Sequence, residues 1–264
     1  MLVNYITSFS HKLYETTGKR LVGSYAKWQI NLAKDASLLH QYSEEDGLGR
    51  RINPDYLNWY LTTFKHLIPP NLGGTAGGCI CATRSKGITA GKINHQPGCH
   101  NTLWNRNAYR WFHKVAALKT YIDGLNSSNT PDYLVWLDCD CFFKQTLPNQ
   151  FIADLCADYD ICYLKGTKRE AIESGILIFN MQVMQARYGI DIIQSWFNWY
   201  KLKWFLKEHR WDDGYILTKV INDGLYRARD LVARKAIGRP ADDCPLTPYI
   251  GHDKGTHVRD HQLF

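Results

Sequence analysis

The chain has no long hydrophobic run. No stretch approaches the ~20 uninterrupted apolar residues that a membrane span requires. Residues 1–6 show no basic region leading into a long apolar segment, so no secretory signal is apparent. Internal repeats are absent too, which excludes a repeat architecture. We therefore expect a cytoplasmic protein without a transmembrane segment, whose eight cysteines are mostly reduced thiols.

The composition limits the architecture and the partner. A chain of 264 residues with 45% hydrophobic content can bury one large core, and we expect a single domain over residues 1–264 with long loops. The 9 Trp and 16 Tyr suit stacking on sugars or bases, but they also suit plain core packing. A net charge of +7 favours an anionic partner such as a nucleotide, a phospholipid or a nucleic acid.

The most informative motif is a pair of aspartates that follows an apolar run. Residues Tyr133 to Leu137 are bounded upstream by a polar turn and predict a short buried strand. Asp138 and Asp140 follow it, and side chains two apart share one face of a strand. In open α/β sheets ligands bind outside the carboxyl ends of strands. Close carboxylates repel each other unless a cation lies between them, so the pair predicts a site for a hard divalent cation.

The other predicted elements alternate as in an α/β protein. Asn53 and Pro54 form a helix start, and apolar residues recur after them at helical spacing. A polar, Gly-rich stretch over residues 71–107 is too long for an ordinary connection and predicts an acceptor-binding or lid insertion. The expected strands are 2–9, 37–42, 133–137, 161–164 and 173–180, and the expected helices are 14–30, 54–67 and 108–125.

Three motifs in the second half carry candidate site residues. Ser174 and Gly175 open the apolar run of residues 173–180, where a ligand could approach the backbone closely. Asp212 and Asp213 stand at the start of a predicted helix, where acids also act as simple caps. Near the end of the chain, a Gly-flanked loop over residues 251–257 offers His252 as a metal ligand and Lys254 as a phosphate-binding cation.

In their order and spacing these motifs resemble the metal-dependent glycosyltransferases of the GT-A fold, in particular small bacterial and phage enzymes. The resemblance covers most of the chain. It departs from the family's pattern at Cys139 and Cys141, which flank Asp140, and over residues 73–106. The matching segments are residues 12–14, 18–20, 42–44, 110–118, 138–140, 173–180, 211–215 and 252–255.

The resemblance implies a fold, an activity and a set of site residues. The fold would be a Rossmann-like, mostly parallel sheet flanked by helices. The activity would be transfer of a sugar from a nucleotide-sugar donor, with a UDP-sugar expected, to a hydroxyl group. Mn²⁺ or Mg²⁺ would be held by Asp138, Asp140 and His252, and the acceptor would face Asp213, with Asp212 beside it. The nucleotide-binding candidates are Thr7, Arg110, Lys114, Asp138, Ser174, Gly175, Lys254 and Gly255.

Each of these assignments has a plainer alternative. Arg110 and Lys114 could form a solvated helix face, and His252 could be a structural loop histidine. Asp213 as a base would give inversion at the anomeric carbon, whereas as a positioning group it is compatible with retention.

Two other functional classes compete with sugar transfer. A strand followed by Asp-X-Asp also opens the site of haloacid-dehalogenase-type phosphatases, but there the motif usually follows the first strand of the core, and here 137 residues precede it. A zinc-binding or nucleic-acid-binding module is the other alternative. Its candidate ligands do not match a standard finger spacing. They are Cys79, Cys81, His95, Cys99 and His100.

The acceptor is the least defined part of the prediction. A glycan or lipid-linked saccharide is one candidate, and double-stranded DNA with hydroxymethylated bases, as in some phages, is the other. The net charge of +7 and the Arg-, Lys- and Trp-containing segment 73–111 favour DNA slightly, because cationic and aromatic residues together bind nucleic acid. The same segment could instead close over a nucleotide sugar.

Overall fold

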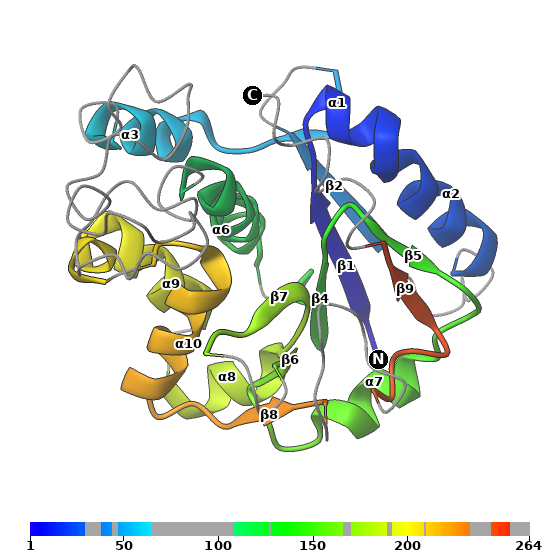
Figure 1. Ribbon diagram of the computed structural model, residues 1–264. Helices are drawn as coiled ribbons and strands as arrows, with labels where there is room; N and C mark the ends of the chain where they lie inside the picture. Colours follow the sequence, from blue (N-terminus) through cyan, green and yellow to red (C-terminus); the bar gives the residue numbers. More distant parts are fainter. Residues whose placement is uncertain are drawn as a thin grey trace, which may run out of the picture.

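The computed structural model (Figure 1) describes residues 1–29, 38–43, 47–64, 108–126, 128–165, 170–188, 192–208, 210–232 and 244–253. The strands are β1 (Val3–Ser8), β2 (Leu38–Ser43), β3 (Arg50–Arg51), β4 (Tyr133–Leu137), β5 (Cys141–Phe143), β6 (Ile161–Leu164), β7 (Glu173–Asn180), β8 (Ala228–Asp230) and β9 (Ile250–His252). The helices are α1 (His11–Leu13), the π-helical segment η1 (Tyr14–Gly18), α2 (Lys19–Trp28), α3 (Pro54–Phe64), α6 (Ala108–Asp123), α7 (Asn149–Cys156), α8 (Met181–Tyr188), α9 (Ile192–Lys201), the 3₁₀ turn η4 (Trp204–Lys207) and α10 (Asp213–Asp223).

Seven of the described strands form one mixed sheet in the order β3-β2-β1-β4-β7-β6-β8. The pairs β1–β2, β1–β4, β2–β3 and β6–β8 are parallel, while β7 runs antiparallel to both β4 and β6. Strands β5 and β9 pair antiparallel with each other beside this sheet (Figure 1). The predicted α/β class with a mostly parallel, Rossmann-like sheet is therefore confirmed.

Alternation along β4 divides the interior into two cores. Leu134 and Trp136 pack into one core, whereas Val135 and Leu137 pack into the other. The first core contains residues of α6, α9 and α10, and the second contains residues of α2 and α7. In Figure 1 these two groups of helices lie on opposite sides of the sheet. Because β4 is covered on both faces, its sequence is a continuous apolar run.

The elements around the site follow the expected pattern with local differences. The strands predicted over 133–137, 161–164 and 173–180 are observed with those bounds. The predicted helix over 14–30 is divided into η1 and α2, and π-helical turns of this kind are frequent at functional sites. His252 lies at the end of β9 rather than on a loop, because its backbone pairs with Cys141.

None of the helices in the described part of the chain is long and apolar enough to span a membrane. The predicted insertion over residues 71–107 lies outside the described residues, as does the expected start of the second strand at residue 37.

Candidate active site

Asp138 lies where β4 ends and the chain turns. Its backbone N–H donates to the carbonyl of Gly175 at 2.8 Å, and its own carbonyl accepts from the N–H of Cys141 at 2.9 Å. The strand stops at Leu137, so the period-two argument that places Asp138 and Asp140 on one face does not apply here. Asp138 contacts groups on the α6 side of the sheet, whereas Asp140 contacts β9.

A buried ammonium gathers the polar groups on the α6 side. Lys114 of α6 is 7% exposed, and its Nζ lies 2.9 Å from Oδ1 of Asp138 and 2.5 Å from Oδ2 of Asp213. It also donates to Ser174, at 2.8 Å to the carbonyl and 2.9 Å to Oγ. Ser174 Oγ in turn donates to Asp213 Oδ2 at 2.7 Å. We call these four residues the lysine cluster. The alternative of a solvated helix face is wrong for Lys114.

The charge of Lys114 is set by two opposing effects. Burial on its own lowers the pKa of this amine, because the charged form loses water. The neighbouring carboxylates of Asp138 and Asp213 favour the charged form and outweigh that loss, so the pKa of Lys114 is raised above its ordinary value. The lysine cluster therefore contains a permanent cation between two acids at neutral pH.

Asp212 and Asp213 are adjacent but have different partners. Asp212 caps α10, since its Oδ1 accepts from the N–H of Tyr215 at 3.1 Å and its Oδ2 accepts from Arg210 Nε at 2.8 Å. Asp213 accepts from the N–H of Gly214 at 2.9 Å and points its other oxygen at Lys114. The capping alternative thus describes Asp212 well, and Asp213 is the acid that reaches the predicted site.

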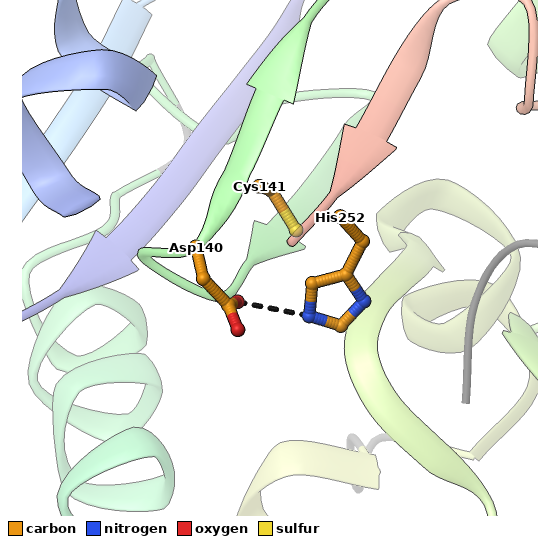
Figure 2. A group of neighbouring side chains, drawn as sticks. All are labelled: Asp140, Cys141 and His252. Carbon is orange, nitrogen blue, oxygen red and sulfur yellow. Dashed lines mark ion pairs between the residues drawn. The ribbon is translucent and has the colours of Figure 1, made fainter. Parts of the chain in front are cut away.

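On the other side of the turn, three donor atoms meet between β5 and β9. Figure 2 shows Asp140, Cys141 and His252 with their side chains directed toward one another. The donor atoms of these three residues, which we call the metal cluster, all lie within 4.8 Å of one another. Asp140 Oδ1 is 2.8 Å from His252 Nε2. Among the described residues this is the group with the spacing of a metal site.

The metal cluster contains buried polar atoms without hydrogen bonds. Within the described part of the chain, neither Asp140 Oδ1 nor His252 Nε2 has an aligned hydrogen-bond partner, although both are screened from solvent. Buried polar atoms without partners are costly. A carboxylate oxygen and an imidazole nitrogen at this distance can share a proton or a cation. The predicted ligands Asp140 and His252 therefore fit a divalent metal.

Gly175 lies between the two clusters. A Cβ at this position would lie 2.5 Å from His252 Cε1 and 3.3 Å from Asp138 Oδ2, so only glycine lets β7 pass this close to both groups. Its carbonyl accepts from Asp138 N–H and, at 3.6 Å, from the thiol of Cys141. The sequence predicted that a ligand could come close to the backbone at Gly175, and in the structure the imidazole of His252 occupies that space.

The remaining predicted residues are only partly placed. Thr7 is buried near the carboxyl end of β1, and its hydroxyl has no hydrogen-bond partner among the described residues. Arg110 lies in the first turn of α6, but its side chain is outside the described set, and Lys254 and Gly255 follow the last described residue. The possible zinc ligands lie outside the described residues too: Cys79, Cys81, His95, Cys99 and His100.

Two contacts were not predicted from the sequence. Trp136 Nε1 donates to Asp138 Oδ1 at 2.8 Å, a bond that joins β4 to the residue that follows the strand. The sequence contains one weak indication that Cys141 belongs to the metal cluster, namely its position directly after Asp140. Cys139 points elsewhere, with its Sγ 3.5 Å from Thr17 Oγ1, and burial raises the pKa of its thiol to about 12.

Comparison with known proteins finds similarity in structure but not in sequence. No protein-family model matches the chain, and no curated protein matches it. The structure is similar to mouse xyloside xylosyltransferase 1, with a TM-score of 0.50 and 9% identity over 88% of this chain and 85% of that one. A weaker likeness is to a glycosyltransferase involved in glycosylation of the major capsid of PBCV-1, with a TM-score of 0.42 and 10% identity over 99% of this chain and 97% of that one. Another is to the galactosyltransferase LgtC, with a TM-score of 0.37 and 12% identity over 87% of this chain and 73% of that one. The fold of this protein is accordingly the GT-A fold of glycosyltransferases.

Proposed function

We propose that this protein is a metal-dependent glycosyltransferase that moves a sugar from a nucleotide-sugar donor to a hydroxyl acceptor. The observation that carries the proposal is the position of the metal cluster and the lysine cluster on either side of Gly175, where β4 ends in a GT-A sheet. Ligands bind outside the carboxyl ends of strands in such sheets. The phosphatase alternative has no corresponding support, because the fold matches glycosyltransferases.

The metal ligands in this proposal are Asp140 and His252, with Asp138 completing the predicted set. When bound, the divalent cation would supply a Lewis acid for the diphosphate of a nucleotide donor, which gains negative charge as the sugar bond breaks. Mn²⁺ and Mg²⁺ are the ions that this reading predicts, and a UDP-sugar is the expected donor. Thr7, Arg110, Lys254 and Gly255 remain nucleotide-binding candidates.

Lys114 acts in this proposal as a positioning residue for both acids. Its ammonium has three protons and four acceptor atoms from Asp138, Ser174 and Asp213 within 2.9 Å. An amine engaged in this way has little capacity left for a phosphate. It instead holds Asp138 beside the metal cluster and Asp213 on the acceptor side.

Asp213 is proposed to orient the reacting groups rather than to remove a proton. Its Oδ2 is paired with Lys114 and accepts from Ser174, and its Oδ1 accepts from Gly214 N–H. These contacts engage both carboxylate oxygens and fix the orientation of the side chain. A positioning role for Asp213 is compatible with retention at the anomeric carbon, and assigning the product anomer by NMR tests it.

The central test replaces Asp140 by Ala. We expect transfer to fall by on the order of 10²–10³-fold or more, as when one stabilising group is removed from a charged transition state. Metal-dependent binding of UDP should be lost as well, as measured by calorimetry. Folding should persist, because the Asp140 side chain is partly exposed and, within the described part of the chain, its Oδ1 has one polar contact, with His252.

The matched control is Asp154→Ala, which removes an exposed aspartate on α7 whose Oδ1 accepts from Gln150 Nε2 at 2.8 Å. It should transfer sugar at the wild-type rate. Transfer by Asp140→Ala at a near wild-type rate would refute the assignment of the site. Activity should be scored by release of nucleoside diphosphate across a panel of sugar nucleotides.

The acceptor is tested in the same panel. The mouse enzyme is by its name a xyloside xylosyltransferase, so simple glycosides are one arm. Hydroxymethylated duplex DNA is the other arm, because the basic, aromatic segment 73–111 favours it. DNA binding through phosphate contacts should weaken steeply with salt. If neither binding nor base modification is seen at low salt, a glycan acceptor becomes the assignment.

A further inference from the structure

We propose that Cys141 is a ligand of the metal, so that the site binds a borderline ion such as Zn²⁺ through oxygen, nitrogen and sulfur. This inference refines the metal site of the proposed function. It differs from the oxygen- and nitrogen-only set of Asp138, Asp140 and His252 that the sequence predicts. It depends on the chain's own residues, and it can be tested by metal binding alone.

The first support is the register of the small sheet. Cys141 of β5 is paired with His252 of β9, and residues directly opposite each other on antiparallel strands place their side chains on the same face. Both side chains are buried. Asp140 precedes Cys141 in the turn, and its carboxylate reaches the same point (Figure 2).

The second support is the unsatisfied state of two of the three donors. His252 Nε2 is buried and lacks a hydrogen bond among the described residues, and so does Asp140 Oδ1. The Cys141 thiol donates a weak, 3.6 Å bond to the Gly175 carbonyl. Ligation would therefore satisfy two costly atoms.

The third support is the chemistry of the donor set. Mg²⁺ and Mn²⁺ prefer oxygen ligands, whereas a thiolate together with an imidazole and a carboxylate suits Zn²⁺. On binding, a sulfur–metal bond forms, the thiol proton leaves to solvent, and no electrons are exchanged. The thiolate cancels one further positive charge of the ion. The buried surroundings of the site favour this partial neutralisation.

The test uses Co²⁺ as a spectroscopic substitute for Zn²⁺. Because Cys79, Cys81 and Cys99 could bind metal independently, all three are replaced by Ser in the starting protein. Co²⁺ is then added while the near-ultraviolet charge-transfer absorption of a cobalt–thiolate bond is recorded. We expect this band to appear at stoichiometric Co²⁺, and to disappear in Cys141→Ser. Calorimetry should show Zn²⁺ affinity falling about 10–100-fold or more in that variant, by analogy with lost metal-site partners.

The control variant is Cys139→Ser, which changes a neighbouring cysteine that contacts Thr17 instead of the metal cluster. It should keep the charge-transfer band. Should the triple-serine protein fail to fold, the difference spectrum between the wild-type chain and Cys141→Ser carries the same information, because only one cysteine differs.

The outcomes separate this inference from the proposed function. Co²⁺ binding without a thiolate band, or with the same band in Cys141→Ser, overturns the role of Cys141 and leaves a metal-dependent transferase with harder ligands. Absence of Co²⁺, Zn²⁺ and Mn²⁺ binding, with and without UDP, overturns both. A band that depends on Cys141 in a protein without transferase activity supports the ligand and removes the proposed reaction.

Discussion

The lysine cluster and the metal cluster both adjoin Gly175, but they differ in whether their buried polar atoms have hydrogen-bond partners. Around Lys114 the ammonium and the Ser174 hydroxyl both donate to acceptors, and two acids balance the cation within 2.9 Å. Around His252 the atoms are just as close, but Asp140 Oδ1 and His252 Nε2 lack hydrogen bonds in the described structure. A satisfied network positions groups, whereas an unsatisfied one provides ligands for something else. We therefore expect substitutions in the lysine cluster to affect stability first, and those in the metal cluster to affect binding first.

The largest stability effect should come from Lys114→Met. This change leaves Asp138 and Asp213 near each other without their cation, and removing one partner of a buried pair costs about 3–5 kcal/mol. Urea unfolding followed by circular dichroism measures the loss. Adding Asp213→Asn to Lys114→Met should recover part of it, because one uncompensated charge disappears.

Lys119→Met on the same helix is the matched control. Lys119 is itself mostly buried, but it pairs with Asp123 four residues along α6, and the Asp123 side chain is 37% exposed, so that carboxylate keeps contact with water when the lysine is removed. Pairs of this kind contribute under about 1 kcal/mol. Equal losses in the two variants would show that the lysine cluster contributes no more to stability than a partly exposed pair on the same helix.

An intermediate effect is expected for Gly175→Ala, which strains both clusters together. The new methyl group would overlap the His252 ring at 2.5 Å and force it to move, at a cost of about 1–3 kcal/mol. Metal affinity should fall as well, because His252 moves away from Asp140. Thermal unfolding and calorimetric metal titration measure the two effects.

Gly23→Ala is the control for that substitution. Nothing lies within 4 Å of the position of its added methyl group in α2, so the change should stabilise the protein by about 0.5–1 kcal/mol through helix propensity. If Gly175→Ala were equally harmless, then β7 would not need its close approach to His252.

The smallest effect is predicted for Asp212→Asn. Burial raises the pKa of Asp212 above its ordinary value of 3.8, against the opposing influence of Arg210. Since the folded form holds the proton more tightly than the unfolded chain, this group's contribution to stability is present below 3.8 and is lost as pH rises through the folded pKa. Wild type should lose stability relative to Asp212→Asn as the pH rises above 3.8, by under about 1 kcal/mol because Asn also caps helices.

The measurement is a set of urea unfolding curves for both proteins across that pH range. A wild-type advantage that grows with pH would contradict the sign. Full transferase activity in Asp212→Asn would confine Asp212 to helix capping and leave Asp213 as the acid of the reaction site.

Local sequence patterns were enough to predict the class of fold and the end of the key strand. Residues 133–137, 161–164 and 173–180 are short apolar runs between breakers, and this pattern can be recognised within each segment although the strands pair with distant ones. The position of Asp138 and Asp140 after β4 follows directly from that pattern. Asp213 at the start of α10 was predicted for the same reason.

Only the tertiary structure decided which of the predicted site residues belong to the lysine cluster and which belong to the metal cluster. The turn after Leu137 sends Asp138 to α6 and Asp140 to β9, because backbone bonds to Gly175 and Asp253 override the period of two. Cys141 meets His252 only through a strand pair that joins residues 111 positions apart (252 minus 141). The helix sequence alone predicts that Lys114 could be exposed, because its partners lie outside the helix, after β4, in β7 and in α10. Composition and periodicity determine which elements form, whereas long-range pairing determines which polar atoms are satisfied and which are left to bind a ligand.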